Sequence, residues 1–167
     1  MSEKYVDINT LKYLLYDVHN LEDLLKRERF IDHEKESIDM FLDSSKDFAD
    51  RELFPYFKEM DENPAYHKDG QVYVHKQVET MMKKGGELGF ISSSFDYEVG
   101  GLQIPLMAST ASSYILDAAN NHLPGYAGLT QGAAELIIHF ADKDLLDKYV
   151  PEMLSGNWGG TMCLTEP

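Results

Sequence analysis

The chain has 167 residues, of which 43% are hydrophobic and 26% charged, a composition typical of one globular domain with a buried core. Its 29 acidic and 15 basic residues give a formal net charge of −14, which argues against binding to nucleic acid or to an anionic membrane surface, because both depend on Lys and Arg. The single cysteine, Cys163, excludes an internal disulfide, and no signal peptide or membrane-spanning stretch is found, so we expect a cytoplasmic protein.

The N-terminal half predicts two amphipathic helical regions. In residues 8–25 apolar side chains recur every three or four positions, and in residues 38–57 a second apolar stripe follows. The pairs Asn63-Pro64 and Asp69-Gly70 then predict a connecting loop over residues 62–73.

A third helix begins near Val74 and either ends at Gly85 and Gly86 or continues to Gly89. Residues 90–105, with the sequence FISSSFDYEVGGLQIP, predict an irregular connection rich in turns.

The C-terminal half predicts three more helices, over residues 105–119, 126–140 and 142–156. The first is rich in Ala and Ser, so we expect it deep in the fold, where small side chains allow close approach. Pro151 lies within the last helix and is expected to kink or split it. Strand-like sequence begins only after Trp158.

These elements predict an all-α fold, an up-and-down bundle of about six helices that are mostly antiparallel to their neighbours. Dinucleotide and phosphate-loop motifs are absent from the sequence. Its six histidines contain no pair three or four residues apart, so we expect no metal site on a helix face. The residues alone therefore predict a helical domain without a recognisable catalytic centre.

Three sequence blocks resemble the acyl-CoA dehydrogenase family. Residues 154–167, LSGNWGGTMCLTEP, resemble the family's junction between its N-terminal helical domain and its middle β-barrel domain. Residues 87–105 resemble the family's Leu-Gly … Tyr-Gly-Gly-Leu-Gly loop, with Val99 in place of the Tyr. Residues 142–156 resemble the family's Gly-x-x-x-Gln-Lys-x-x-Tyr-Leu-Pro-x-Leu-x-x-Gly block: Tyr149, Pro151 and Gly156 stand at the matching positions, and Lys148 lies directly before Tyr149.

The resemblance implies three parts. Residues 1–34 form a helical extension, similar to that of the longer 3-methylthiopropanoyl-CoA dehydrogenases. Residues 35–158 form the N-terminal helical domain of the family, and residues 159–167 are the first strand of a β-barrel domain that is otherwise missing. We therefore expect the sequence to be the first part of a longer enzyme.

The chemistry that the resemblance implies is the α,β-dehydrogenation of an acyl-CoA thioester with FAD, which takes up the β hydrogen as hydride. Electron-transferring flavoprotein or another acceptor would then take the electrons. In the family the catalytic base belongs to the C-terminal domain, so we expect no acidic residue of this chain to be that base. Family members are typically homotetramers, so a homo-oligomer is expected.

The same resemblance implies that Met162, Leu164 and Thr165 approach the flavin ring. The alternative is that this stretch is only a strand that pairs with a missing neighbour. Gly128 and Gly132 fall at the acyl-chain end of the pocket; they lie four residues apart and so on one helix face. They predict either a roomy pocket for a long or branched acyl group or close helix packing, which glycine also permits.

Two other functions remain open on the sequence. Within the same fold family, an acyl-CoA oxidase or a flavin monooxygenase would look alike in this part of the chain. A helical protein-interaction domain without enzymatic activity, with residues 8–25 as its partner-binding helix, is the alternative of another class.

Overall fold

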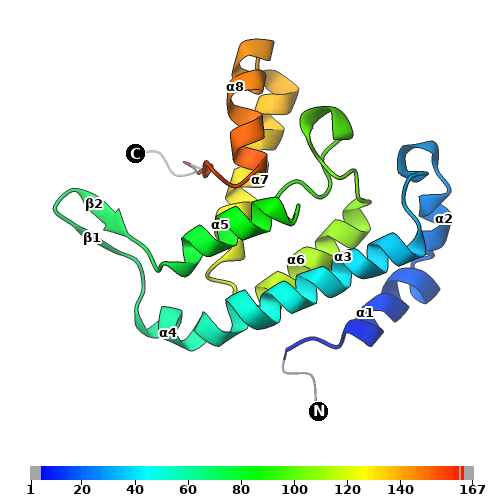
Figure 1. The fold of residues 1–167 in the computed structure, drawn as a ribbon, viewed down its shortest axis with the longest axis horizontal. Helices are drawn as coiled ribbons and strands as arrows, with labels where there is room; N and C mark the ends of the chain where they lie inside the picture. The colour runs from blue at the N-terminus through cyan, green and yellow to red at the C-terminus, as the bar shows by residue number, and fades with distance from the viewer. Residues whose placement is uncertain (1–4, 162, 164–167) are drawn as a thin grey trace.

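The structure of this chain, a computed structural model, describes residues 5–161 and residue 163. It is a layer of packed helices from which the hairpin of α7 (Pro124–Phe140) and α8 (Lys143–Leu154) rises on one side, and a small β-hairpin projects at one end (Figure 1). The predicted all-α bundle is confirmed.

The N-terminal extension is helical but broken. Helix α1 spans Ile8–Tyr13 and continues as a π-helical turn over Leu14–Val18, and α2 spans Leu21–Leu25. The prediction of one continuous helix over residues 8–25 is wrong, because the helix is interrupted at Asn20. The φ angle of Asn20 is 53°, in the left-handed region that asparagine tolerates.

The extension packs on α3, which spans Lys35–Phe48. The Tyr16 hydroxyl donates to Asp39 Oδ1 at 3.0 Å, and Lys12 Nζ donates to Asp43 Oδ1 at 2.9 Å. The Lys35 ammonium lies 4.5 Å from the centre of the Tyr16 ring. Polar contacts therefore join the extension to the rest of the fold beside the burial of Leu15 and Leu21.

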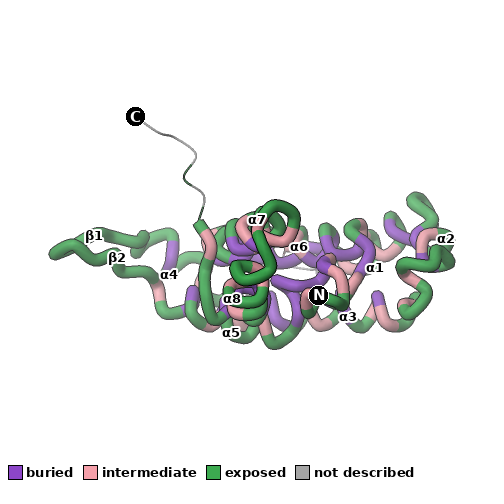
Figure 2. The backbone as a smooth tube through the Cα atoms, turned by 90° about the horizontal axis from the view of Figure 1, so that it is seen from above, coloured by how far each residue is buried: buried purple, intermediate pink, exposed green. Residues whose placement is uncertain are grey.

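Helices α3 and α6 form the centre of the layer. After Phe48, the chain of α3 continues through a π-helical turn (Ala49–Leu53) and a 3-10 turn (Phe54–Tyr56) into α4, Phe57–Glu62. Helix α6 spans Leu106–Asn120 and, as predicted, lies deep: Ala108 and Ile115 have no exposed surface. Figure 2 shows the buried residues concentrated along these central helices.

The two central helices run in the same direction, which is an exception to the mostly antiparallel arrangement that the sequence predicts. The Ser45 and Ser112 hydroxyls lie 2.7 Å apart, and Asn120 Nδ2 donates to the Leu53 carbonyl at 3.0 Å. In each pair the two partners are 67 residues apart in sequence. A constant separation of this kind shows that the two chain segments run parallel. Small side chains on α6 permit this close contact.

A β-hairpin replaces part of the loop predicted over residues 62–73. Strands β1 (Tyr66–Lys68) and β2 (Gln71–Tyr73) pair antiparallel. Asp69 and Gly70 form the turn with positive φ angles of 53° and 78°, the combination that a two-residue hairpin turn of type I′ requires. The hairpin is fully exposed and projects from the body (Figures 1 and 2).

Helix α5 spans Gln77–Glu87; it passes through Gly85 and Gly86 and ends two residues before Gly89, between the two predicted ends. The connection that follows is irregular, as expected. Its two arms are joined by backbone hydrogen bonds from Leu102 N to the Ser92 carbonyl and from Ile104 N to the Ser93 carbonyl. Gly100, with φ of 88°, makes the turn between the arms.

Helices α7 (Pro124–Phe140) and α8 (Lys143–Leu154) form a hairpin, and Asp142 caps α8 by accepting from the Leu145 N–H at 3.0 Å. Pro151 lies inside α8 without splitting it. The strand expected after Trp158 falls largely outside the described residues; residues 159–161 and 163 have no regular secondary structure. Among the described helices, none is long and apolar enough to cross a membrane.

Candidate functional site

Gly128 and Gly132 lie on the exposed side of α7. A Cβ atom added at either position would meet no heavy atom of the described chain within 4 Å. Close packing between helices of this chain is therefore not the reason for these two glycines. A glycine inside a helix lowers the stability of the helix by about 1 kcal/mol relative to alanine, so two such glycines need a reason. The open space that they leave beside α7 is the feature to explain.

The open space is a groove between α6 and α7, made of two adjoining hollows. One, of about 210 Å³, contains Gly128, and the other, of about 310 Å³, contains Gly132. Ser113 of α6 and Gln131 of α7 line both hollows, so the two are neighbours along one groove. We call this the α6–α7 groove.

The two hollows differ in chemistry. The hollow at Gly128, here called the apolar hollow, is walled by Met81, Phe90, Leu116, Pro124 and Ala127. The hollow at Gly132, here called the polar hollow, is walled by Ser94, Ser109, Thr110 and Glu135, together with Phe95 and Leu106. A ligand that fills the groove therefore meets mainly hydrocarbon at one end, and at the other end several hydroxyl groups beside Phe95 and Leu106.

Gln131 fixes the wall between the hollows. Its Nε2 donates to the carbonyl of Phe90 at 3.2 Å and to that of Ile91 at 2.9 Å, which ties α7 to the chain that follows α5. Sequence reasoning missed this residue, because nothing in the local pattern shows that a glutamine between two glycines bridges to a segment 40 residues away.

The groove is acidic. Asp117 lines the apolar hollow and Glu135 the polar hollow, and no Lys or Arg is found among the described residues that line either. Burial raises the pKa of the Asp117 carboxyl above its ordinary value. The groove therefore disfavours a further negative charge.

The other side of α7 is tightly packed. Thr130, with no exposed surface, donates from Oγ1 to the Tyr126 carbonyl at 2.7 Å and accepts there from the Gly160 N–H at 3.0 Å. A Cβ at Gly160 would lie 2.7 Å from the Cβ of Ala133. The segment that leads into the predicted flavin residues is thus held directly against α7.

A ring contact supports the same segment. Tyr149 of α8 and Trp158 have ring centres 5.7 Å apart, and both residues belong to the blocks that carry the family resemblance. The predicted flavin residues Met162, Leu164 and Thr165 lie outside the described residues. Their role stays a prediction, as does that of Gly128 and Gly132 toward an acyl group.

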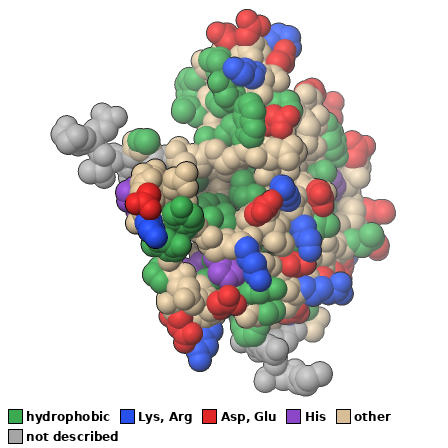
Figure 3. Space-filling model, turned by 60° about the vertical axis from the view of Figure 1, so that its left-hand side comes forward, with side chains coloured by type: hydrophobic (Ala, Val, Ile, Leu, Met, Phe, Trp, Pro, Cys, Tyr) green, Lys and Arg blue, Asp and Glu red, His purple; other side chains and the backbone are tan. Residues whose placement is uncertain are grey.

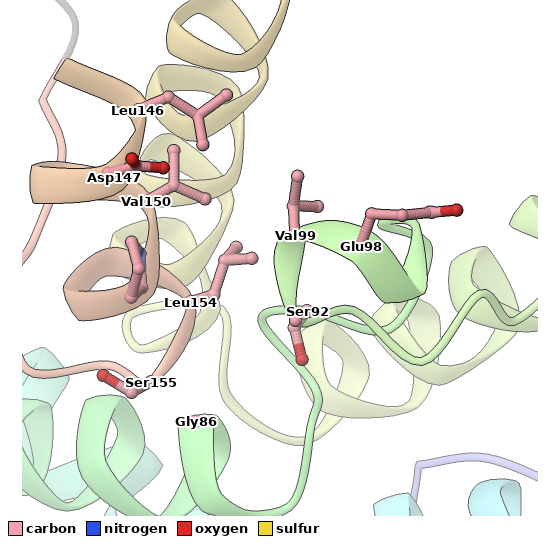
Figure 4. A pocket seen from close by; sticks show the side chains of 11 residues that line it. Gly86, Ser92, Glu98, Val99, Leu146, Asp147, Val150, Leu154 and Ser155 are labelled. Atoms are coloured by element: carbon pink, nitrogen blue, oxygen red, sulfur yellow. The ribbon is translucent and has the colours of Figure 1, made fainter. Parts of the chain in front are cut away.

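A separate cavity of about 650 Å³ lies between α8 and the irregular connection. Figure 4 shows Leu146, Val150 and Leu154 of α8 on one side of it and Ser92 and Val99 on the other. Of the predicted site residues, the structure describes Gly128 and Gly132, and neither lines this cavity. Asp147, at its edge, is paired with Lys143 of its own helix at 2.9 Å.

Apolar side chains also remain exposed on the α7–α8 hairpin, which Figure 3 shows as a hydrophobic region below its charged tip. Leu136 is 62% exposed and Phe140 82%. Surfaces of this kind mark places where another domain or chain packs. Within the described residues, no group of three or more His, Cys, Asp or Glu side chains is arranged to hold a metal ion.

Comparison with known proteins identifies the fold. Residues 35–157 match the family described as acyl-CoA dehydrogenase, N-terminal domain. A probable acyl-CoA dehydrogenase from Bacillus subtilis is 23% identical over 168 residues, which cover all of this chain and 26% of that protein. A butyryl-CoA dehydrogenase from Syntrophomonas wolfei is 51% identical over 39 residues, 23% of this chain and 6% of that protein.

A solved structure has a similar fold. It is described as an electron transferring flavoprotein of Acidaminococcus fermentans, and it aligns with a TM-score of 0.53 and 22% identity over 74% of this chain and 30% of that one. The whole chain aligns with only 26% of the Bacillus subtilis protein, so it spans about a quarter of the length of that relative.

Proposed function

The chain belongs to the acyl-CoA dehydrogenase family, as its N-terminal domain, and from this premise we propose that it forms one wall of the flavin and acyl-chain site of an FAD-dependent acyl-CoA dehydrogenase. The rest of the active site, including the catalytic base, would come from later parts of a longer polypeptide. In this proposal residues 1–34, 35–158 and 159–167 are the extension, the helical domain and the beginning of the β domain.

One observation carries the proposal: α7 has two faces with opposite properties. Its open face carries Gly128 and Gly132 and borders the α6–α7 groove, where an acyl group would lie. Its packed face holds Gly160 through Thr130, only two residues before Met162. A single rigid helix would thus fix the distance between the acyl group and the chain segment next to the flavin.

The described residues are compatible with a flavin at the end of this segment. Thr161 and Cys163 are exposed on either side of Met162, whereas Gly160 is anchored, so the chain leaves α7 at a defined point and becomes open to a ligand. Met162, Leu164 and Thr165 would hold the flavin. When bound, FAD would accept the hydride from the β carbon of the thioester.

The contribution of this chain would be orientation and exclusion of water. The apolar hollow would bury part of the acyl chain against Met81, Phe90 and Leu116. Asp117 and Glu135 line the groove, but we assign neither of them the role of the base that removes the α proton of the thioester. An electron-transferring flavoprotein, or another acceptor, would reoxidise the enzyme, and the exposed Leu136 and Phe140 would be covered by a neighbouring domain or subunit.

The visible absorption spectrum of the purified full-length protein tests the proposal. We expect a flavin spectrum that bleaches when an acyl-CoA thioester is added anaerobically, with free CoA as the control that leaves it unchanged. A colourless protein, or a flavin that no thioester reduces, would contradict the proposed function.

A further inference from the structure

The polar hollow is an unusual surface for a hydrocarbon chain. Of its nine lining residues, six have polar side chains: Ser94, Ser109, Thr110, Ser113, Gln131 and Glu135. Covering hydroxyl and amide groups with a hydrocarbon removes their hydration without giving them a partner, which is unfavourable. Although Phe95 and Leu106 also line the hollow, a ligand with a hydrogen-bonding group of its own would suit it better than a purely hydrocarbon chain.

Several of these polar groups are available to a ligand. The Ser109 hydroxyl is already paired with that of Ser93 at 2.7 Å. In contrast, within the described chain the side chains of Ser94, Thr110 and Ser113 make no hydrogen bond, although Ser113 is half-buried between the two hollows. Gln131 uses only its amide nitrogen, so its carbonyl oxygen remains an acceptor. The hollow thus offers three hydroxyls, those of Ser94, Thr110 and Ser113, and the carbonyl oxygen of Gln131.

The neighbouring apolar hollow requires the opposite chemistry, because Met81, Phe90, Leu116 and Ala127 are suited to hydrocarbon. As the hollows adjoin, the ligand that suits both best has a hydrocarbon part and a polar part. At Gly132 the absence of a side chain leaves the space in which a substituent would lie.

The charge of the groove limits which substituent the ligand can carry. Glu135 in the polar hollow, whose carboxylate lies 3.7 Å from His139 Nε2, and Asp117 in the apolar hollow make the groove acidic, and no Lys or Arg is found among the described residues that line it. A carboxylate on the ligand would be repelled at both ends of the groove. The substituent should therefore be uncharged.

We infer that the α6–α7 groove selects an acyl group that carries an uncharged hydrogen-bonding substituent, a hydroxyl, on an otherwise hydrocarbon chain. Thr110, Ser113 and the Gln131 carbonyl would bind the hydroxyl, and the apolar hollow would bind the chain. This inference rests on the proposed function, since it takes the groove to be the acyl site.

Three CoA thioesters of equal chain length test it with the full-length protein: unsubstituted, hydroxylated beyond the β carbon, and ending in a carboxylate. We expect kcat/KM to be about tenfold higher for the hydroxylated thioester than for the unsubstituted one, because a tenfold difference corresponds to about one net hydrogen bond. The carboxylate thioester should be the poorest of the three.

The double variant Thr110→Val, Ser113→Ala assigns the preference to the groove. It removes the two α6 hydroxyls that bind the substituent in this inference, with little change in volume, and we expect the ratio of hydroxylated to unsubstituted kcat/KM to fall well below ten, toward one. The matched control is Ser44→Ala, a half-buried serine of α3 outside the groove, which should keep the tenfold ratio.

The outcomes separate the two proposals. If unsubstituted thioesters react as well as the hydroxylated one, or if the double variant keeps the full preference, the inferred substituent is wrong while the dehydrogenase function stands. If no thioester reduces the flavin, both proposals fall.

Discussion

Two regions of this chain use glycine for opposite reasons. Around Gly86 and Gly160 the backbone of one segment lies so close to another that a methyl group has no room. Around Gly128 and Gly132 a methyl group would touch nothing. The first pair is explained by the fold alone, and the second is not, which is why the open face of α7 is the better guide to function.

The largest expected effect comes from filling a packed position. In Gly86→Ala the new Cβ would overlap the Ser155 carbonyl and lie 2.9 Å from Gly156 N, and neither backbone group can move easily. We expect the free energy of unfolding to fall by about 2–3 kcal/mol, as overpacking of a rigid site does. Denaturant unfolding of the purified protein measures it.

The neighbouring residue provides the control. A Cβ at Gly85 would meet only the flexible end of Met81, at 3.4 Å, so Gly85→Ala should not lower stability. Equal destabilisation by the two substitutions would show that helix position, rather than the contact with Ser155, decides the effect.

A smaller effect is expected at the anchor of the C-terminal segment. Thr130→Val removes the acceptor for the Gly160 N–H while it keeps the shape of the side chain. An unpaired buried N–H costs roughly 1–3 kcal/mol, and we expect the lower part of that range because the bond is only part-buried.

In the full-length protein the same substitution should also weaken flavin retention. Thr130→Ser, which keeps the hydroxyl, is the matched control and should behave like the wild type in both unfolding and flavin content. Full flavin retention in Thr130→Val would mean that this anchor does not position the cofactor segment.

On the open face of α7, substitution of a glycine should stabilise the protein instead of destabilising it. Gly128→Ala and Gly132→Ala add a methyl group into free space in a helix, so each should raise the free energy of unfolding by about 0.4–1 kcal/mol. A loss of stability in either variant would show that another part of the folded protein packs on this face.

The smallest expected effect concerns Asp117. Because burial raises its pKa above the ordinary value of 3.8, the folded state favours the protonated carboxyl, and stability is lost as the pH rises through that raised pKa. Asp117→Asn should therefore be slightly more stable than the wild type at pH 7, with the difference vanishing at low pH. A stability difference between Asp117→Asn and the wild type that does not change with pH would show that the raised pKa of Asp117 is not its cause.

Much of the fold could be predicted because helix periodicity is local. The small apolar side chains of α6 indicated its deep position, and the burial of Ala108 and Ile115 bears this out. The β-hairpin was missed although Asp69-Gly70 is the strongest short signal for a two-residue turn, and the break at Asn20 was missed because the apolar stripe continues across it.

The groove could be predicted only in part. Sequence spacing places Gly128 and Gly132 on one face of a helix, but it cannot tell whether that face is packed or open. The polar hollow, and the contacts of Gln131 with Phe90 and Ile91, depend on which faces of α6 and α7 meet. Tertiary arrangement decides those contacts, and no local pattern encodes it.

The most direct test of the account is the chain-length preference of the full-length protein after Gly128→Leu, measured as kcat/KM over a series of acyl-CoA thioesters. If the open face of α7 receives the acyl group, the leucine side chain fills the apolar hollow and the optimum moves to shorter chains. An optimum at the same length as in the wild type, in a variant that still folds and keeps its flavin, would contradict the assignment of the groove.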